Sequence, residues 1–408
     1  MTLRLSIRRM RMNRQNEHDN ALVSHPFVLL VPPFDLFPFA PFDLFPYSFA
    51  LMCIRFGLFL LLLLVVACSV PPDQLLLVST DTPSLYASHG KSGAWFNPWL
   101  PRKKGWSTIF RWAVSQSSYR GEWRDPLDVP RVANDGSSFA FSEHSASVTW
   151  VGHSTFVVHD DTDIFLTDPQ FNTRALIPKR HHPPGVPISS IPGSAFAVIS
   201  HNHYDHLDAY SVETLPASVT WFVPMGLGDW FREKGRKAVV ELNWWQTAQH
   251  GRWKVTCVPV QHWSQRIEQG QNSTLWCGWV ISSGERTYFF GGDTGYFHGF
   301  TEIGKRFGPI DVALLPIGAY EPRWIMHYSH MNPGEAYHAF LDLKARWMVP
   351  CHWGTFKLTD EPIDEPPREL RRVVEAAGGS FEPIHVMAIG ERWEIPDSSH
   401  ELRVASGE

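Results

Sequence analysis

The sequence contains few cysteines, and no run of basic residues follows its histidine-rich stretch at 201–206. Five of its 408 residues are cysteine, and two of these, Cys53 and Cys68, fall in an N-terminal segment unlike the rest of the chain. The remaining three thiols do not make a disulfide framework. The formal net charge of -5 offers little attraction to a polyphosphate backbone, so a nucleic-acid partner is not expected.

Aromatic residues, by contrast, are abundant. The chain has 18 tryptophans and 27 phenylalanines, and 44% of its residues are hydrophobic. This composition is typical of a large core, a lipid-facing surface, or both. A chain of this length can form one large domain or two.

The first 80 residues differ in composition from the rest of the chain. The string Pro-Phe-Asp-Leu-Phe-Pro occurs at 33–38 and again at 41–46, and it suits neither helix nor strand. We predict that residues 1–51 are a non-structural tail or the product of an overlong gene start. Residues 52–68 have the order of a secretory signal, with Arg55, an apolar run over 56–66, and a small residue before Cys68.

Residues 52–68 resemble a bacterial lipoprotein signal. The resemblance implies that Cys68 is the lipidated first residue of the mature protein, which would then be membrane-anchored in the periplasm or the outer membrane. An uncleaved membrane anchor is the alternative, because residues 47–54 could lengthen the apolar stretch. A cytoplasmic or inner-membrane-associated location is the alternative to the lipoprotein.

An N-terminal arm is predicted over residues 69–130. Its part from 97 to 130 mixes aromatic residues, such as Trp99 and Trp106, with bases such as Arg111 and Arg120. Indole rings and cations together suit a membrane interface. A solvated arm with a few core tryptophans explains the same mixture.

The most informative stretch runs from residue 197 to residue 206. A short apolar run ending at Val198 and Ile199 predicts the end of a buried strand, and it is followed by three histidines and an aspartate. We expect the first two histidines to project from the loop, and the aspartate and last histidine to enter the next helix. These candidate ligands are His201, His203, Asp205 and His206. Imidazole and carboxylate without thiolate favour zinc, and to a lesser extent iron or manganese.

Further apolar runs also end on ligand-type residues. The runs at 253–261, 287–292 and 346–351 are followed by His262, Asp293 and His352, and a run at 164–167 ends on Asp168. Because parallel or mixed sheets gather the loops beyond their strand ends on one rim, we expect these side chains to converge. Cys351 adjoins one of them, but strand alternation points its side chain away. Between these runs, we predict helices over 211–215 and 227–234 and a strand over 219–223.

These residues resemble the metallo-β-lactamase superfamily, and more narrowly the N-acylphosphatidylethanolamine-hydrolysing phospholipase D family. The narrower match covers about residues 97–394. It is carried by the segments 148–155 (VTWVGHST), 165–169 (FLTDP), 261–263 (QHW), 292–296 (GDTGY), 319–324 (AYEPRW) and 352–356 (HWGTF). The resemblance implies an α/β fold, a four-layered αβ/βα sandwich, which we place at residues 131–400.

The resemblance also implies a metal centre with two zinc ions, for which iron or manganese could substitute. His201, His203 and His262 would hold the first ion. Asp205, His206 and His352 would hold the second, and Asp293 would bridge the two. Asp168 would orient a ligand histidine from outside the ligand set, and His153 would be structural.

Substrate contacts are expected from the segment 319–330. The resemblance implies that His330 touches the phosphate or protonates the departing alkoxide, although His327 and His338 are nearby and equally titratable. Arg323 could pair with a phosphate oxygen or could be a structural ion-pair partner of an acid such as Glu321, and Tyr320 could line an acyl path.

Several functions remain open from the sequence. The leading one is a zinc phosphodiesterase in which Asp293, His330 and Asp205 take part in catalysis and the partners are a membrane phospholipid and the membrane surface. A hydrolase of a lactone, ester or amide with the same fold is the runner-up. A metal-binding lipoprotein without turnover is less favoured, because the ligand set is complete. The sequence leaves the oligomeric state open.

Overall fold

The computed structural model describes residues 81–100, 119, 129–140 and 145–396. Contacts divide the chain into two compact units, Met1–Val70 and Pro71–Glu408, and every described residue belongs to the second. The predicted tail, the predicted signal and most of the predicted arm lie outside the described residues, so their assignments stay predictions. Within the described ranges, no helix combines the length and the apolar character needed to cross a bilayer.

Two mixed sheets form the framework of the second unit. The seven-stranded sheet has the order β17 (Arg392–Glu394), β3 (Ala146–Gly152), β4 (Thr155–Asp160), β5 (Asp163–Thr167), β6 (Phe196–Val198), β7 (Thr220–Pro224), β8 (Val239–Leu242). The six-stranded sheet has the order β16 (Ala345–Cys351), β15 (Ile310–Pro316), β14 (Thr287–Phe290), β13 (Gly278–Ser282), β10 (Trp253–Val258), β9 (Thr247–His250). Strands β5 to β8 are mutually parallel, as are β14 to β16.

Helices and short ribbons complete the described elements. The helices are α3 (Ala209–Thr214), α4 (Gly228–Glu233), α5 (Gly299–Phe307), α6 (Arg323–Met326), α7 (Pro333–Leu343) and α8 (Pro366–Ala376). Short 3-10 turns are η1 (Thr82–Tyr86), η2 (Ser137–Ala140) and η3 (Ile188–Ser190). Two-residue strands pair as β1 (Gly90–Lys91) with β2 (Ala94–Trp95), and β11 (Gln265–Arg266) with β12 (Gly270–Gln271).

The seven-stranded sheet is buried on both faces because successive side chains point to opposite sides of a strand. In β5, Phe165 packs into the core shared with the other sheet, where its ring meets Tyr288 edge-on at 5.4 Å, while Leu166 packs into the core under helices α3 and α4. In β7, Phe222 faces the shared core and Trp221 faces the helices. The alternation therefore separates two hydrophobic layers.

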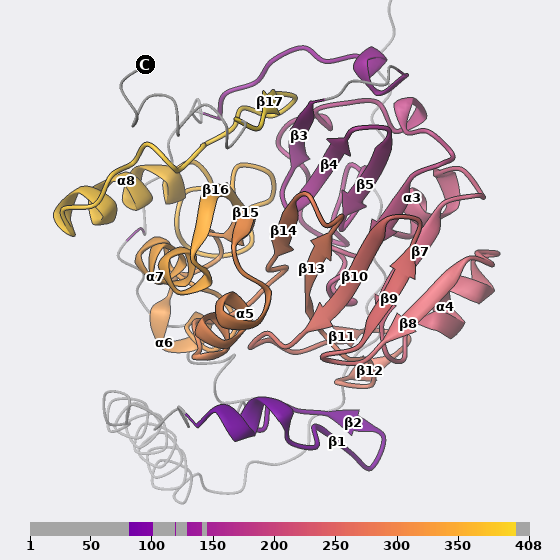
Figure 1. The fold of residues 1–408 in the computed structure, drawn as a ribbon, viewed down its shortest axis with the longest axis horizontal. Coiled ribbons are helices and arrows are strands. Elements are labelled where there is room, and N and C mark those ends of the chain that lie inside the picture. The colour runs from indigo at the N-terminus through magenta and orange to yellow at the C-terminus, as the bar shows by residue number, and fades with distance from the viewer. Residues whose placement is uncertain (1–80, 101–118, 120–128, 141–144, 397–408) are drawn as a thin grey trace, which may run out of the picture. The chain divides into compact units, whose positions relative to one another are not determined.

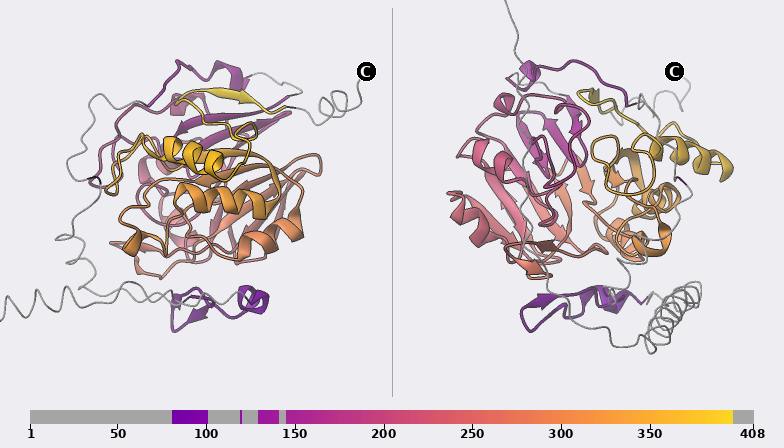
Figure 2. Two further views of the ribbon diagram at one scale, coloured as in Figure 1. Left: turned by 90° about the vertical axis from the view of Figure 1, so that its left-hand side faces the viewer. Right: turned by 180° about the vertical axis from the view of Figure 1, so that it is seen from behind.

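Helices cover the outer face of each sheet. Figure 1 shows α3 and α4 on one side of the molecule and α5, α7 and α8 on the other. The side view shows the second group of helices lying over the six-stranded sheet (Figure 2), where Phe300 of α5 meets Phe289 of β14. The predicted four-layered αβ/βα sandwich is confirmed. Fully buried tryptophans, among them Trp150 and Trp279, belong to its core rather than to a lipid-facing surface.

Strand β16 ends at Cys351 as predicted, whereas β10 ends at Val258 and β14 at Phe290, two or three residues before the predicted ends of their runs. One helix begins later than predicted. Asp205 and His206 lie in a turn and not in a helix, because α3 starts only after Asp208. The side chain of Asp208 accepts hydrogen bonds from the backbone N–H groups of Tyr210 and Ser211, and this N-cap fixes the start of the helix. The prediction that Asp205 and His206 enter the helix was therefore wrong, and both residues belong to the loop beyond β6.

Candidate metal centre

The seven predicted ligands meet at the carboxyl ends of strands from both sheets. His201, His203, Asp205 and His206 follow β6, His262 follows β10, Asp293 follows β14 and His352 follows β16. Strand β10 runs in the same direction as β14, because both are antiparallel to β13. Their ligand atoms form two groups in which all atoms lie within 4.8 Å of one another: His201, His203, His262 and Asp293, and then His153, Asp205, His206 and His352.

The first group presents three ring nitrogens to one point. The Nδ1 atom of His203 lies 2.8 Å from Nε2 of His201 and 3.3 Å from Nε2 of His262. Ligands of a tetrahedral zinc ion, at roughly 2.0–2.1 Å from the metal, would be separated by about 3.3 Å. The nitrogens are thus close to the separation that a single zinc ion requires.

Hydrogen bonds to the far side of two rings set their tautomers. The Nδ1 atom of His262 lies 2.9 Å from the carbonyl oxygen of Ser329, which can only accept. His201 Nδ1 lies 2.8 Å from the hydroxyl of Ser200, and this hydroxyl in turn donates to Asp168. Both rings therefore carry their proton on Nδ1 and aim the lone pair of Nε2 inward, which is the form that binds a metal.

In the second group, a ring nitrogen of His206 faces two carboxylates. His206 donates from Nδ1 to Oδ2 of Asp168 at 2.6 Å, a contact that agrees with the predicted role of Asp168 in orienting a histidine. Its Nε2 atom then faces Oδ2 of Asp293 at 3.2 Å and Oδ2 of Asp205 at 3.6 Å. Lone pairs at these distances repel one another unless a cation lies between them. The donors therefore fit a metal ion at this position.

The pKa values of the histidines in the second group also indicate that positive charge is stabilised there. Burial opposes protonation of His206 and His352, yet the Asp293 and Asp205 carboxylates raise the pKa of His206 well above its usual value and that of His352 to about 9. In the first group, burial holds the pKa of His201 and His262 well below the usual range, so both rings are neutral. A bound cation would supply the charge that His206 and His352 otherwise take up as protons.

His153 belongs to the centre more closely than its predicted structural role suggested. Its Nε2 atom lies 3.1 Å from Oδ2 of Asp205, and its backbone carbonyl accepts the N–H of His352 at 3.1 Å. The residue adopts a left-handed conformation with φ 55°, and its own N–H donates to Thr355 Oγ1 at 2.7 Å. His153 thereby holds two members of the second group in place. The sequence feature that could have indicated this role is the position of His153 between two strands, directly after Gly152.

His330 lies at the edge of the two groups. It is nine-tenths buried, and its Nδ1 atom is 3.9 Å from Oδ2 of Asp293. Among the described residues, Nδ1 has no hydrogen-bond partner. Burial lowers the pKa of His330 to about 3, so the ring is neutral in the free protein. The structure thus brings His330 to the centre, while the expected alternative His338 contacts Tyr296.

Arg323 is engaged in contacts within the protein. Its guanidinium Nη2 donates to both carboxylate oxygens of Glu335, at 2.9 and 2.8 Å, and Nη1 donates to the carbonyl of His330 at 3.0 Å. These contacts favour the structural alternative, with Glu335 as ion-pair partner in place of Glu321. Tyr320 is buried, and burial together with the neighbouring Tyr119 raises the pKa of its hydroxyl. The predicted substrate contacts of both residues stay predictions.

Asn97 is a site residue that the sequence analysis did not single out. Its buried amide donates to the carbonyl of His262 at 3.0 Å and to the hydroxyl of Tyr328 at 2.7 Å, and it accepts from Trp276 Nε1 at 3.0 Å. Trp99 donates to Gln261 at 3.1 Å and is buried in the core. This part of the predicted arm therefore packs against the ligand loop after β10. The available signal was the Asn-Pro-Trp string that opens the family resemblance.

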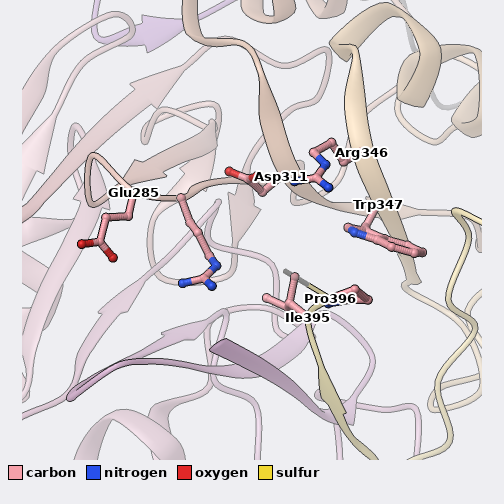
Figure 3. Close-up of a pocket in the computed structure, with 7 residues that line it drawn as sticks. Glu285, Asp311, Arg346, Trp347, Ile395 and Pro396 are labelled. Carbon is pink, nitrogen blue, oxygen red and sulfur yellow. Dashed lines mark ion pairs between the residues drawn. The ribbon is translucent and has the colours of Figure 1, made fainter. Parts of the chain in front are cut away.

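A cavity at the opposite ends of the strands is distinct from the metal centre. It has a volume of about 120 Å³ and lies beside Glu285, Asp311, Arg346 and Trp347, at the amino ends of β14, β15 and β16 (Figure 3). Arg346 is paired there with Asp311 at 3.7 Å. None of the predicted site residues lines it.

Comparisons with known proteins agree with this geometry. A family model described as a beta-lactamase superfamily domain matches residues 164–353. The chain is 36% identical over 325 residues to N-acyl-phosphatidylethanolamine-hydrolyzing phospholipase D 1 of Caenorhabditis elegans, covering 74% of this chain and 91% of the nematode protein. It is 35% identical over 268 residues to the mitochondrial N-acyl-phosphatidylethanolamine-hydrolyzing phospholipase D of Saccharomyces cerevisiae, covering 62% of this chain and 56% of the yeast protein.

A solved structure shares the fold. The crystal structure of a possible metal-dependent hydrolase from Veillonella parvula superposes with a TM-score of 0.50 at 15% identity, covering 61% of this chain and 99% of that chain. The curated relatives and the paired clusters of histidine and aspartate together identify a metal-dependent hydrolase. The chain belongs to the N-acylphosphatidylethanolamine-hydrolysing phospholipase D family, within the metallo-β-lactamase superfamily.

Proposed function

We propose that this chain is a dinuclear zinc phosphodiesterase that hydrolyses N-acylphosphatidylethanolamine to an N-acylethanolamine and phosphatidic acid. The observation that carries the proposal is the position of Asp293 between the two ligand groups. Its Oδ2 atom lies 3.9 Å from Nε2 of both His201 and His262. The same carboxylate lies 3.2 Å from His206 and 3.0 Å from His352. One carboxylate shared by two donor sets suits a two-metal hydrolytic site.

The donor chemistry supports zinc. All seven proposed ligands offer imidazole nitrogen or carboxylate oxygen, and no cysteine of the described chain joins either group. When bound, two divalent cations roughly 3.5–4 Å apart lower the pKa of a water and neutralise charge on a phosphodiester. The protein's contribution is to fix the ligand tautomers through Asp168, Ser200 and Ser329 and to keep the site buried.

His330 is the residue we assign to the substrate. Its imidazole is close to Asp293, it belongs to neither of the two main ligand groups, and its Nδ1 atom has no partner among the described residues. It can donate a hydrogen bond to a phosphate oxygen or to the departing alkoxide oxygen. Arg323 holds the carbonyl of His330 and so positions it, which gives Arg323 an indirect role.

The identity of the substrate rests on the relatives. The nematode and yeast proteins are named for hydrolysis of N-acylphosphatidylethanolamine, and the nematode protein aligns over nearly all of its length. We therefore propose the same class of membrane phospholipid for this chain, with the membrane surface as its partner. A substrate of this kind has three types of bond that a hydrolase could cleave: the phosphodiester, the carboxyl esters and the amide.

The test is the fate of the water oxygen. Hydrolysis of a long-chain N-acylphosphatidylethanolamine in oxygen-18 water should place the label in phosphatidic acid, because attack at phosphorus expels the N-acylethanolamine. Mass spectrometry of both products measures it. Label found only in free fatty acid would move the protein to the carboxyl-ester or amide hydrolases. If no bond of this lipid is hydrolysed by protein that has metal bound, another substrate such as a lactone is favoured.

Metal content provides a separate test of the centre. Protein made with zinc available should contain two zinc ions per chain by elemental analysis, and the content should fall by about half when His352 is replaced by Ala, because the first group stays intact. Protein without any bound zinc would refute the site assignment. Binding of iron or manganese in the same ratio would keep the two sites and correct the metal.

A further inference from the structure

An exposed hairpin beside the metal centre has a rigid apolar tip. Arg174 and Lys179 form an isolated antiparallel bridge, and the N–H of Ala175 donates to the carbonyl of Pro178 at 2.9 Å. The tip residues Leu176 and Ile177 are 51% and 78% exposed. The guanidinium of Arg174 donates to the carbonyl of Ile177 at 2.9 Å. The backbone is thus fixed in a turn that holds two aliphatic side chains in solvent.

Positive charge flanks the tip on both sides. Arg174 and Lys179 are exposed, and neither has an acidic partner among the residues that the structure describes. The sequence contains no Asp or Glu between Asp168 and Asp205. Two further histidines, His181 and His182, follow the hairpin. The surface here therefore combines an aliphatic apex with unopposed cations.

The base of the hairpin is anchored to the loop that carries the ligands. The backbone N–H of Phe171 donates to the hydroxyl of Ser211 at 2.8 Å, and Asn172 donates to Asp208 at 3.3 Å. Arg180 is buried and donates to the carbonyl oxygens of Gln170 and Asn172. Because Asp208 lies two residues after His206, these hydrogen bonds join the base of the hairpin to the end of the ligand loop 201–206.

We infer that the hairpin 174–179 is the contact of this enzyme with an anionic membrane, in which Leu176 and Ile177 enter the interface and Arg174 and Lys179 meet lipid headgroups. Apolar side chains next to cations bind such surfaces by burial and by attraction to acidic lipid together. The inference rests on the proposed function, because a lipid substrate must be taken from a bilayer. It names the surface that brings the site to the substrate.

A lipid surface fits this hairpin better than a protein partner does. Stable protein interfaces bury about 800 Å² on each partner and involve roughly 20–30 residues a side. Two exposed aliphatic residues and two cations on a narrow turn fall far short of that. A fluid headgroup layer requires no shape complementarity, so a small tip with the correct charge is sufficient.

The chain offers a matched control for this tip. Ile267, in the hairpin joining β11 and β12, is 79% exposed, nearly the same as Ile177. Its neighbouring base, Arg266, is paired with Glu268 at 2.7 Å, so this second tip carries no unopposed positive charge. The two isoleucines therefore differ in electrostatic surroundings and not in exposure.

The first experiment places an environment-sensitive fluorophore at each tip. Full-length Ile177→Cys and Ile267→Cys variants are labelled in a Cys53→Ser, Cys68→Ser background, in which the other three cysteines are buried. Vesicles of phosphatidylcholine mixed with an equal amount of phosphatidylglycerol should shift the emission at 177 to shorter wavelength, and vesicles of phosphatidylcholine alone should shift it less. An equal shift at both tips, or none at 177, would overturn the inference.

The second experiment separates membrane contact from chemistry. The double variant Arg174→Glu, Lys179→Glu should raise KM for substrate in anionic vesicles by about 30-fold or more, because each cation near an acidic leaflet contributes a factor of about five to binding. Its kcat/KM for a short-chain soluble substrate should not change. Equal loss on both substrates would overturn the inference and indicate damage to the site.

The two experiments distinguish failure of this inference from failure of the proposed function. If the labelled Ile177→Cys protein shows the emission shift but wild-type protein does not hydrolyse the phospholipid, the membrane contact is supported and the substrate is wrong. If wild-type protein hydrolyses the phospholipid but the labelled Ile177→Cys protein shows no shift, the substrate is supported and the hairpin is not the membrane contact.

Discussion

Replacement of Asp168 by Asn should weaken metal binding although Asp168 is not a ligand. The carboxylate accepts three hydrogen bonds: from His206 Nδ1 at 2.6 Å, from the hydroxyl of Ser200 at 2.6 Å and from the N–H of Ser200 at 2.7 Å. An asparagine can keep the backbone bond through its oxygen. Its amide nitrogen then faces His206 Nδ1–H and the Ser200 hydroxyl, which are both donors.

The expected consequence is a change of tautomer. Metal binding requires His206 to be neutral with its proton on Nδ1, but without an acceptor at Nδ1 the neutral ring is more stable with the proton on Nε2, the atom that faces Asp293. That proton occupies the place of the metal, so the ring no longer acts as a ligand. Loss of such an orienting carboxylate typically costs about 10–100-fold in metal affinity, which corresponds to about 1.4–2.8 kcal/mol.

The assay is titration of metal-free protein with zinc in competition with a chromophoric chelator. Asp168→Asn should bind zinc about 10–100-fold more weakly, and the second site should show the larger loss because His206 belongs to it. Asp229→Asn, on the exposed surface of α4, serves as the matched control and should bind as wild type does. Wild-type affinity in Asp168→Asn would show that the carboxylate does not control the His206 tautomer and would refute the reasoning.

Three further predictions concern other parts of the molecule. Asp293→Asn should reduce turnover more than His153→Ala, because Asp293 faces both ligand groups and His153 contacts only the second, and equal losses in steady-state kinetics would show that Asp293 is not shared. Asn97→Leu should lower the free energy of unfolding, measured by urea titration, by about 2–4 kcal/mol, because the buried carbonyl of His262 and hydroxyl of Tyr328 lose their donor. An unchanged midpoint of urea unfolding would show that these hydrogen bonds do not stabilise the fold. Cys68→Ser in a bacterial host should release the protein from the membrane fraction or block its processing, whereas unchanged attachment with an intact N-terminus would favour the uncleaved anchor.

The ligand set was predictable because of a simple physical regularity. Strands buried on both faces appear in the sequence as apolar runs, and the residues that follow β6, β10, β14 and β16 lie at one rim because these four strands end there. His262, Asp293 and His352 satisfied this rule and meet at the centre with His201 and its neighbours. Asp168 satisfied it as well, and its role as an orienting carboxylate agrees with its contact to His206.

Contacts between distant segments were not predictable in the same way. His153 follows a strand, as several proposed ligands do, but its bond to Asp205 depends on a left-handed backbone that the sequence does not specify for a non-glycine residue. Asn97 reaches His262 across 165 positions of the chain, and nothing in its local pattern indicates a buried amide. The sequence allowed Arg323 an acidic partner but could not select Glu335 over Glu321.

The strand ends and the loops have different roles in the site, and this difference affects which substrate the enzyme accepts. The ligands are fixed by sheets buried on both faces, so the metal centre has little freedom to differ between hydrolases of this fold. The hairpin 174–179 and the segment 319–330 lie outside the strands, so the sheets do not fix them. Arg323 and Glu335 lock that segment and thereby set where His330 stands. A change of substrate would therefore require changes in these two segments before any change in the ligands, and the hairpin is the part that a soluble substrate would not need.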